Sequence, residues 1–218
     1  MTVTDIPVVR PLQARSRETE QRLIGAALSL LSQGGLAACQ IPDVARDAGV
    51  SVGAVYRRFT EKNALLTAAF RAMLDAQAQF EGAIWTDRAC AAADLGGAIR
   101  TMVEMLVDAN ERGATIMIAL QSFLQDGADS SLKDHVRDHR RRMLNAMAER
   151  LVSMAGADAP DDVHDRIRFA LLAMSGTLNA LLIQKGADSL GWEAPRDRVV
   201  DETTAMLVRY VVGVDKQG

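Results

Sequence analysis

A phenol and three cations lie within residues 56–62, at Tyr56, Arg57, Arg58 and Lys62. Guanidinium and ammonium groups neutralise the phosphates of a nucleic acid, and a phenol can donate a hydrogen bond to a phosphate oxygen. Small residues come just before them, where a backbone could approach a ligand closely. These residue types at this spacing suit phosphate contact, provided that a rigid element presents them together.

The surrounding segment has the layout of a helix-turn-helix, in which the second helix enters a DNA major groove. We predict short helices over residues 41–48 and 52–59. A small side chain at Ala45 lets the two helices cross closely, and Gly49 can adopt the positive φ that ends the first helix. Ser51 is a good N-cap for the second helix, and its hydroxyl could equally face a phosphate.

The first turn of the second helix is the expected reading surface. Val52, Gly53 and Ala54 are small enough to let the backbone approach base edges. Three apolar side chains are expected to hold the helices together from inside: Val50, Val55 and Phe59. An ordinary pair of short helices with a solvated basic face is the alternative. The preceding amphipathic helix and the charge distribution argue against that alternative.

Charge is divided unequally along the chain. The net charge of −3 argues weakly against a nucleic-acid partner. Residues 10–71, however, carry nine Lys and Arg against five Asp and Glu, which is +4, whereas residues 72–218 carry sixteen against twenty-two, which is −6. A basic N-terminal part on an acidic body is expected when only one end of a protein meets phosphate.

A set of residues within 17–66 resembles the DNA-binding domain of TetR/AcrR-type bacterial regulators. The matching positions are Val44, Ala45, Ala48, Gly49, Val50, Ser51, Gly53, Val55, Tyr56, Phe59, Lys62, Leu65 and Leu66. The rest of the chain is similar to that family only in length and helical character. The resemblance implies a homodimer built on the last two long helices, with a small-molecule pocket in each C-terminal domain.

Two positions depart from the family pattern. Gln40 stands where the family usually has a Thr that caps the first short helix and touches a phosphate, so this contact is in doubt. Gln is a poor cap, and Pro42 partly compensates by presetting φ near the first turn. Arg58 stands where the family often has His, which keeps a cation able to bind phosphate. The predicted DNA-binding residues are Gln40, Ser51–Ala54, Tyr56–Arg58 and Lys62.

Helical periodicity continues to the C-terminus and predicts an all-α fold, in which a three-helix DNA-binding domain precedes a larger helical domain for ligand binding and dimerisation. We expect a flexible arm over 1–14, the helix-turn-helix domain over 15–62 and the larger domain over 63–218. Further breaks are expected at Gly34-Gly35, Gly113, Gly127, Gly156–Pro160 and Gly186–Pro195. The predicted longer helices are 17–33, 62–80, 88–112, 113–126, 130–155, 161–186 and 196–213.

Two apolar faces near the C-terminus could pair into a four-helix bundle between two chains, or could be core within one chain. The first comprises Ile167, Leu171, Met174, Ser175, Leu178, Leu182 and Ile183. The second comprises Val199, Val200, Thr203, Met206, Leu207, Tyr210 and Val211.

A methionine-rich set could line a ligand pocket, because Met adapts to irregular cavities, although plain core is the alternative. The candidates are Met102, Met105, Leu106, Met117, Leu120, Gln121, Phe123, Leu124, Met143 and Met147. Gln121 or Asn179 could orient a bound molecule. Such a lining favours an effector that is largely apolar and of modest size.

Other groupings have weaker signals. His135 and His139 share a helical face, but there is no HExxH motif and no cysteine partner nearby, so two solvated histidines are expected rather than a metal site. The basic run at Arg137 and Arg140–Arg142 is interleaved with acids and predicts a solvated, salt-bridged face. No cofactor, metal or catalytic residue is expected.

The chain's composition predicts a cytoplasmic protein without a membrane partner. Only Cys39 and Cys90 occur, which suits a reducing compartment. Residues 1–7 lack the features of a signal peptide. No run approaches the roughly 18–20 apolar residues of a membrane span, since 180–185 is far too short.

The sequence therefore predicts a ligand-responsive repressor that binds a pseudo-palindromic double-stranded operator as a homodimer and is released by a small effector. The helix over 62–80 joins the two parts and is the expected lever. One alternative is a helical small-molecule sensor with weak or lost DNA binding, which Gln40 favours. The other is an enzyme on an all-α scaffold, for which no paired nucleophile and base appear.

Overall fold

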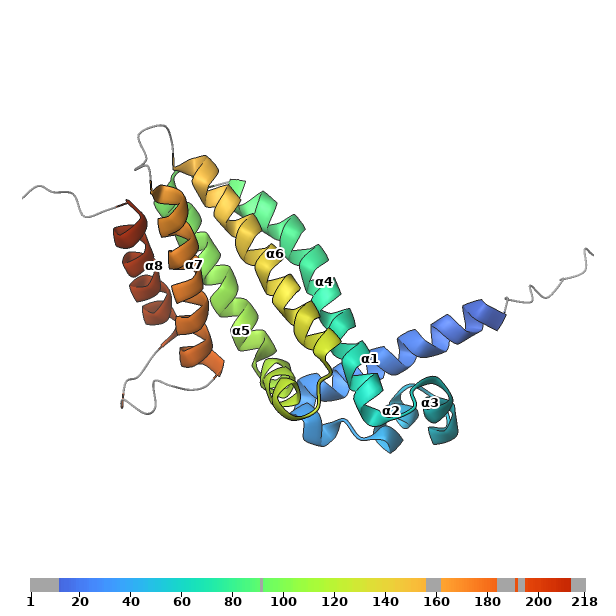
Figure 1. Cartoon of the computed structure of the whole chain (residues 1–218). Helices are drawn as coiled ribbons and strands as arrows, with labels where there is room; N and C mark the ends of the chain where they lie inside the picture. The colour runs from blue at the N-terminus through green and yellow to red at the C-terminus, as the bar shows by residue number, and fades with distance from the viewer. Residues whose placement is uncertain (1–11, 91, 156–161, 184–190, 192–194, 213–218) are drawn as a thin grey trace, which may run out of the picture.

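A computed structural model describes residues 12–90, 92–155, 162–183, 191 and 195–212 of the chain. This part of the chain contains eight α-helices, one π-helical segment and no strand, which confirms the all-α prediction (Figure 1). The elements are α1 (Leu12–Ala38), α2 (Ile41–Asp47), α3 (Val52–Arg58), α4 (Lys62–Cys90), α5 (Leu95–Asp126), α6 (Ser130–Met154), α7 (Val163–Leu178), η1 (Asn179–Ile183) and α8 (Arg196–Val212).

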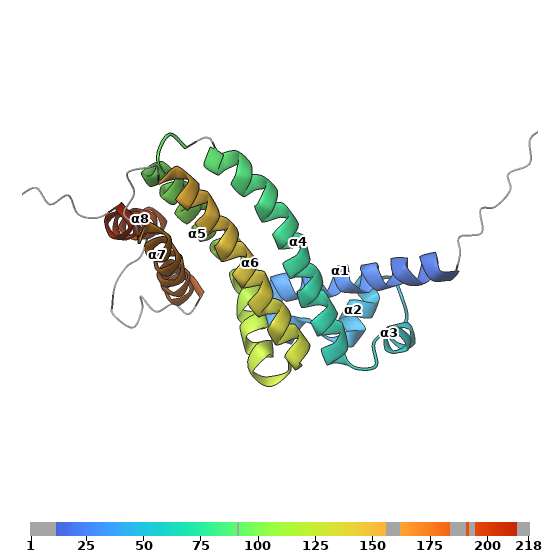
Figure 2. The ribbon, with the colours of Figure 1, turned by 45° about the horizontal axis from the view of Figure 1, so that its top comes forward.

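The helices form an elongated arrangement with two distinct ends. Helices α1, α2 and α3 gather at one end, whereas α7 and α8 lie side by side at the other (Figures 1 and 2). The long helices α4, α5 and α6 run between the ends and pack on one another. Helix α5 also packs on both α1 and α8, so it is the element that touches both ends.

Helix α1 ends at the glycine pair, as the sequence predicts. Gly34 (φ −149°, ψ 20°) and Gly35 (φ 64°, ψ −153°) leave the helical region, and the few residues after them form a separate turn. The start of α1 differs from the prediction, because the helix begins at Leu12, inside the expected arm of residues 1–14. Residues 1–11 of that arm lie outside the described residues.

The predicted end of α4 and the predicted start and division of α5 were wrong. Helix α4 continues to Cys90, and α5 begins after Asp94, whose carboxylate accepts a hydrogen bond from the Gly97 N–H at 2.7 Å. This N-cap fixes the start of α5. Gly113 does not break the helix. A glycine inside a helix costs only about 1 kcal/mol, which the packing of a 32-residue helix readily exceeds.

Buried side chains form two hydrophobic clusters, and α5 contributes to both. The first cluster combines the interior of α1–α4 with Ala119, Leu120 and Phe123 from the C-terminal half of α5. Phe123 lies against Phe70 of α4, with ring centroids 5.6 Å apart. The second cluster contains Met102 and other residues of the N-terminal half of α5, together with parts of α6, α7 and α8. Helix α5 therefore joins the two ends through packed side chains.

The two apolar faces expected near the C-terminus belong mostly to the interior of a single chain. In α7, Ile167, Leu171 and Met174 are buried in the second cluster, and the same holds for Val199 and Leu207 in α8. Core within one chain, the alternative that the sequence left open, therefore accounts for most of both faces. Several apolar side chains on α7 and α8 are exposed, of which Met206 and Tyr210 belong to the second predicted face and the others to neither: Phe169, Leu172, Met206, Tyr210 and Val212.

Within the described residues, the helical stretch Val163–Ile183 is long and apolar enough to cross a membrane, with a mean hydropathy of 1.3. Its buried side chains pack with α5, α6 and α8 in the second cluster. That packing accounts for the buried part of the stretch, which is 33% of its apolar window.

Candidate nucleic-acid interface and ligand cavity

The turn between α2 and α3 has the geometry that its residues predict. Gly49 adopts φ 65°, the left-handed conformation that other residues rarely take. Ser51 caps α3, because its hydroxyl oxygen accepts a hydrogen bond from the Ala54 N–H at 3.2 Å. Ala45 is buried where the helices meet, which explains the need for a small side chain. The turn and the cap together fix the direction in which α3 projects.

Helix α3 has one buried and one exposed face. Val55 is fully buried, and Phe59 just beyond the helix is also part of the first cluster. On the opposite face Val52 is 40% exposed and Tyr56 is 52% exposed, with Arg57 beside them. Val52 and Tyr56 are therefore exposed together on a helix that is capped at its start.

Gln40 and Lys62, both predicted phosphate contacts, are bonded to each other. The Lys62 ammonium donates to the Gln40 side-chain oxygen at 3.1 Å, while the Gln40 amide donates to the Ala37 carbonyl at 2.9 Å. Gln40 makes no side-chain cap to α2, as expected of Gln, and Pro42 lies in the first turn. Gln40 therefore holds Lys62 near the start of α2 instead of capping that helix.

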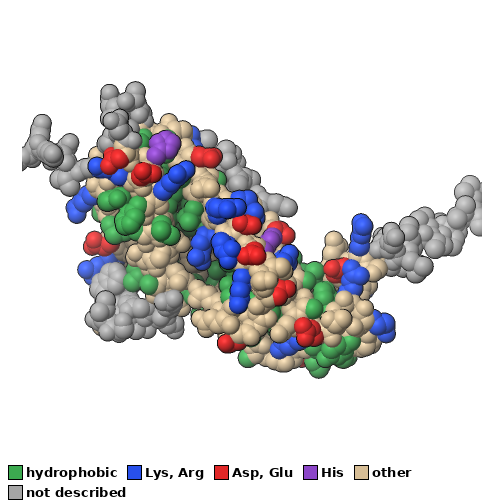
Figure 3. Space-filling model, in the orientation of Figure 1, with side chains coloured by type: hydrophobic (Ala, Val, Ile, Leu, Met, Phe, Trp, Pro, Cys, Tyr) green, Lys and Arg blue, Asp and Glu red, His purple; other side chains and the backbone are tan. Residues whose placement is uncertain are grey.

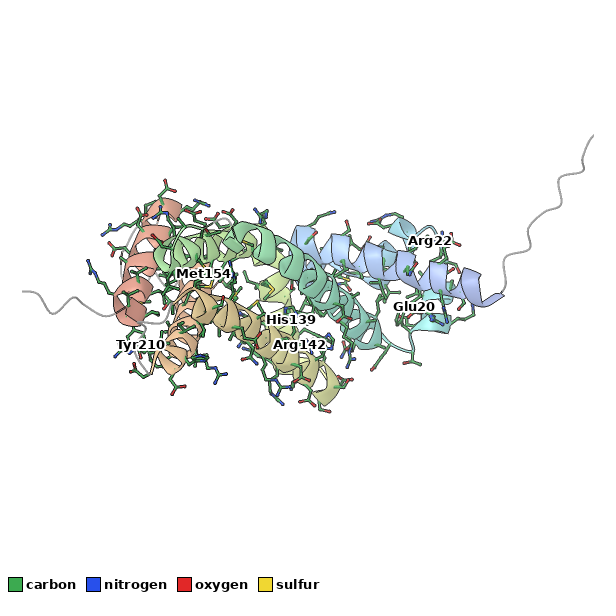
Figure 4. All side chains as sticks on the ribbon, turned by 90° about the horizontal axis from the view of Figure 1, so that it is seen from above. Glu20, Arg22, His139, Arg142, Met154 and Tyr210 are labelled. Atoms are coloured by element: carbon green, nitrogen blue, oxygen red, sulfur yellow. The ribbon has the colours of Figure 1, made fainter. Side chains whose placement is uncertain are left out.

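Arg58 faces α1 rather than solvent alone. Its guanidinium forms an ion pair with Glu20 and a 3.3 Å hydrogen bond to the Ser16 hydroxyl. Figure 4 shows Glu20 on α1. Arg58 thus ties α3 to α1, and its predicted phosphate contact would require the ion pair with Glu20 to be shared or broken.

Arg22 of α1 is a candidate that the sequence reasoning missed. It is exposed, and its guanidinium lies 4.0 Å from the position that a Cβ on Gly49 would occupy, so it lies beside the turn before α3 (Figure 4). Arg46 of α2 is less available, because it pairs with Asp43 at 2.7 Å and with Asp47 at 3.2 Å. The sequence does not show which of Arg22 and Arg46 lies beside the turn before α3, so only the fold distinguishes them.

A cavity of about 170 Å³ lies between α4, α5, α6 and α7. Of the predicted ligand residues, those that line it are Leu106, Met117, Leu120, Gln121, Leu124, Met143 and Asn179. Met102, Phe123 and Met147 are buried in the clusters instead, and Met105 packs against the second cluster. Several other residues that line the cavity were not among those predicted: Leu74, Gln77, Asn110, His139, Arg140 and Met174.

Amide groups form the polar part of the cavity wall. Gln121 of α5 donates a hydrogen bond to the Asn179 side-chain oxygen at 2.7 Å, and both groups are partly buried. Asn179 begins η1, the π-helical turn at the end of α7. Single π-helical turns often occur at functional sites, because they redirect side chains within a helix. Asn110 donates to the Leu106 carbonyl at 2.7 Å, so its amide is held along α5.

The prediction of two solvated histidines was wrong for His139. This side chain is buried in the cavity wall, and burial lowers its pKa, with smaller contributions from Arg142, His135 and Arg140. His135 lies 3.1 Å from an Asp75 carboxylate oxygen. No group of three His, Cys, Asp or Glu side chains suited to a metal ion occurs in the described part of the chain.

The basic run on α6 is salt-bridged in part, as predicted. Arg137 pairs with Asp134 at 2.8 Å, and Arg141 pairs with Asp138 at 3.1 Å. Figure 3 shows Lys and Arg side chains gathered over α6. Arg140, by contrast, lines the cavity.

Comparison with known proteins relates this arrangement to one family. Residues 23–69 match the family described as "Bacterial regulatory proteins, tetR family". The HTH-type transcriptional repressor KstR of Mycolicibacterium smegmatis is 33% identical to the chain over 156 residues, which are 68% of this chain and 69% of KstR.

Solved structures show the same fold. A TetR-family transcriptional regulator from Mesorhizobium loti superposes with a TM-score of 0.67 at 17% identity, covering 92% of this chain and 99% of that one. The regulator FadR from Bacillus subtilis, solved in complex with stearoyl-CoA, has a TM-score of 0.57 at 14% identity, covering 89% of this chain and 98% of that one.

Proposed function

The chain belongs to the TetR family of bacterial regulatory proteins and is a transcriptional regulator. From this premise we propose that it is a repressor, that it binds a pseudo-palindromic operator as a homodimer, and that a small, largely apolar effector releases it. We further propose that it acts in the cytoplasm, without cofactor, metal or catalytic activity of its own.

The exposed face of α3 is the observation that carries the DNA-binding role. Val52 and Tyr56 project from a helix that is capped by Ser51 and anchored by Val55. A short, firmly held helix with its first turn exposed is the geometry that helix-turn-helix proteins place in the major groove. We assign base contacts to Val52–Ala54. Phosphate contacts are assigned to Ser51, Tyr56, Arg57 and Lys62, and also to Gln40 and Arg58 if their present partners release them.

The proposed dimer uses the exposed apolar side chains of α7 and α8. Phe169 is 59% exposed and Leu172 is 60% exposed, and the Phe169 ring lies 5.4 Å from that of Tyr210 on α8. Met206 is exposed on α8 as well, and Figure 3 shows hydrophobic side chains over this end of the molecule. Apolar groups clustered on two adjacent helices favour a four-helix bundle with a second copy.

Signal transfer from the cavity to α3 is proposed to run through α4 and α5 together. Leu120 lines the cavity and is also buried in the first cluster, among the side chains that hold α1–α3. Leu74 of α4 has the same double role. A ligand that moves either side chain changes the packing behind the DNA-binding helices. Release requires that the ligand prefer a conformation in which the two copies of α3 no longer fit the operator spacing.

One alternative function is favoured by a specific observation. Gln40 occupies the Lys62 ammonium, and Glu20 occupies the Arg58 guanidinium, so two predicted phosphate-binding cations already have partners. A ligand sensor that binds DNA weakly would show this arrangement. Both pairs are solvent-accessible, however, and the exposed Arg58–Glu20 ion pair contributes only about 0–1 kcal/mol, while Gln40 offers Lys62 a neutral oxygen, so a phosphate can compete for both cations.

The two functions are separated by binding to DNA. Fragments of the source genome that the full chain retains would be sequenced and used in mobility-shift titrations at increasing salt. A repressor should select a shared pseudo-palindromic sequence and lose affinity steeply as salt rises, because cations that contact phosphates release counterions. A sensor without DNA binding should enrich no sequence at all.

A further inference from the structure

The charged groups around the cavity are of one sign. Its polar wall consists of neutral amides, Ser175, His139 and one guanidinium, that of Arg140. No Asp or Glu side chain is found among the described residues that line the cavity. A cationic ligand would therefore meet no carboxylate there, whereas an anionic group would meet Arg140.

Arg140 is available to such a group. Its neighbours on α6 are committed, because Arg137 pairs with Asp134 and Arg141 pairs with Asp138. Arg140 forms no ion pair with any residue in the described part of the chain, and it is exposed at the cavity wall. A guanidinium with five donors and no acid partner matches a carboxylate or a similar oxyanion.

The field around His139 has the same sign. Burial is the main cause of its lowered pKa, and the positive charges of Arg142 and Arg140 lower it further. Figure 4 shows His139 and Arg142 together on α6. Asp75 acts in the opposite direction, but it lies against His135 at 3.1 Å. The neutral imidazole of His139 can donate one hydrogen bond to an anion.

The rest of the cavity suits an apolar body. Leu106, Met117, Leu120, Met143 and Met174 surround it. Its volume is about 170 Å³, and an apolar cavity of about 150 Å³ is known to hold benzene. A ring or a short branched chain therefore fits without rearrangement of the wall.

We propose that the effector site takes an amphipathic anion, with a carboxylate or another oxyanion bound by Arg140 beside His139 and an apolar body held among the leucines and methionines. The proposal rests on the proposed function in that it treats this cavity as the effector site. It adds the charge of the ligand, which neither the fold nor the family determines.

Three matched probes test the proposal by calorimetry on the full chain: 3-phenylpropanoate, 3-phenylpropan-1-ol and 3-phenylpropylammonium. The carboxylate should bind about tenfold more tightly than the alcohol, the worth of one charge-assisted hydrogen bond. The ammonium should bind most weakly of the three. Added salt should weaken binding of the carboxylate and leave that of the alcohol nearly unchanged.

Arg140→Gln should remove the preference for the carboxylate while keeping affinity for the alcohol, which also shows that the variant folds. Arg141→Gln is the matched control, because that guanidinium pairs with Asp138. A preference that survives Arg140→Gln, or no binding of any probe, would overturn the assignment. Arg140-dependent binding that leaves DNA affinity unchanged would support the anion site and contradict the proposed release of DNA.

Discussion

The helix-turn-helix (α2 and α3) and the α7–α8 pair are both two-helix units, yet they differ in how their sequences relate to their surfaces. In α3 the buried Val55 packs in the first cluster, and the exposed Tyr56 and Val52 lie on the other side of the helix. In α7 the buried Leu171 is next to the exposed Leu172. Helix α7 is apolar on more than one side, so periodicity cannot separate the core of the chain from a surface that meets another chain.

This difference shows what an all-round apolar helix indicates in a folded protein. A helix with one partner needs one apolar stripe, and a wider apolar surface is expected when a second partner covers it. Helix α3 packs through one apolar side on the first cluster, and we propose that its other face meets DNA. The α7–α8 pair has internal partners in α5 and α6 and, we propose, an external partner in a second copy.

Separate replacement of the two adjacent leucines of α7 should give the largest difference in stability between a buried and an exposed position. Leu171→Ala should lower the free energy of unfolding by about 2–5 kcal/mol, because it leaves a cavity in the second cluster. Leu172→Ala should change the stability of the single chain by about 0.5 kcal/mol or less. Urea unfolding at several protein concentrations separates these effects from dimer dissociation. Equal losses for both variants would mean that α7 has no distinct outer face.

A charge introduced at Leu172 tests whether the exposed side of α7 forms the proposed dimer interface. Leu172→Glu should raise the dissociation constant of the dimer by about a hundredfold, because the interface would bury an unpaired carboxylate. Sedimentation equilibrium measures the change. Asn145→Glu, exposed on α6, is the control and should leave the dimer intact. A wild-type protein that is monomeric throughout would contradict the proposed interface.

On the DNA side, the contribution of a single cation should be smaller. Lys62→Ala should weaken binding to all sequences by about 1 kcal/mol and reduce the slope of log affinity against log salt by about one. Lys133→Ala, exposed on α6, should change neither quantity. If the salt slope of Lys62→Ala matches that of the wild type, the Lys62 ammonium stays bonded to Gln40 and does not contact a phosphate. A change at Val52 should alter sequence preference instead.

The smallest expected effect concerns His139 and pH. Burial is the main cause of the lowered pKa of His139 in the folded chain. Just below pH 6.5, the ordinary pKa of the group, the unfolded chain therefore binds a proton that the folded chain does not bind. Folding stability from this group is therefore complete above pH 6.5 and declines as pH falls below it. Urea midpoints should fall less for His139→Gln than for the wild type on acidification. A larger fall in the variant would reverse the assigned direction.

Local signals account for what the sequence could predict. Ser51 as a cap, Gly49 at positive φ and the break at Gly34 depend on residues within a few positions, so their conformations could be predicted. The predicted break at Gly113 was wrong, because a glycine is tolerated inside a long packed helix. The Arg58–Glu20 pair links α3 to α1 and depends on how the helices cross.

The residues that line the cavity were harder to predict, because they depend on how α5 and α6 pack in the folded chain. Met102 and Met117 look alike in sequence, and only the rotation of α5 places Met117 in the cavity wall and Met102 in the second cluster. The same holds for His139, which an isolated helix would leave exposed. The methionine-rich sequence allowed either a pocket or plain core, and the fold shows which of these side chains line a cavity.

The central claim, that two copies of α3 read one operator, is tested most directly by hydroxyl-radical footprinting of the full chain on a selected genomic fragment. Two protected half-sites are expected, related by a two-fold axis and about 10–10.5 base pairs apart or a multiple of that spacing. Protection should be lost in Leu172→Glu at concentrations that saturate the wild type. One isolated protected site, or protection that persists in that variant when it is monomeric, would contradict the claim.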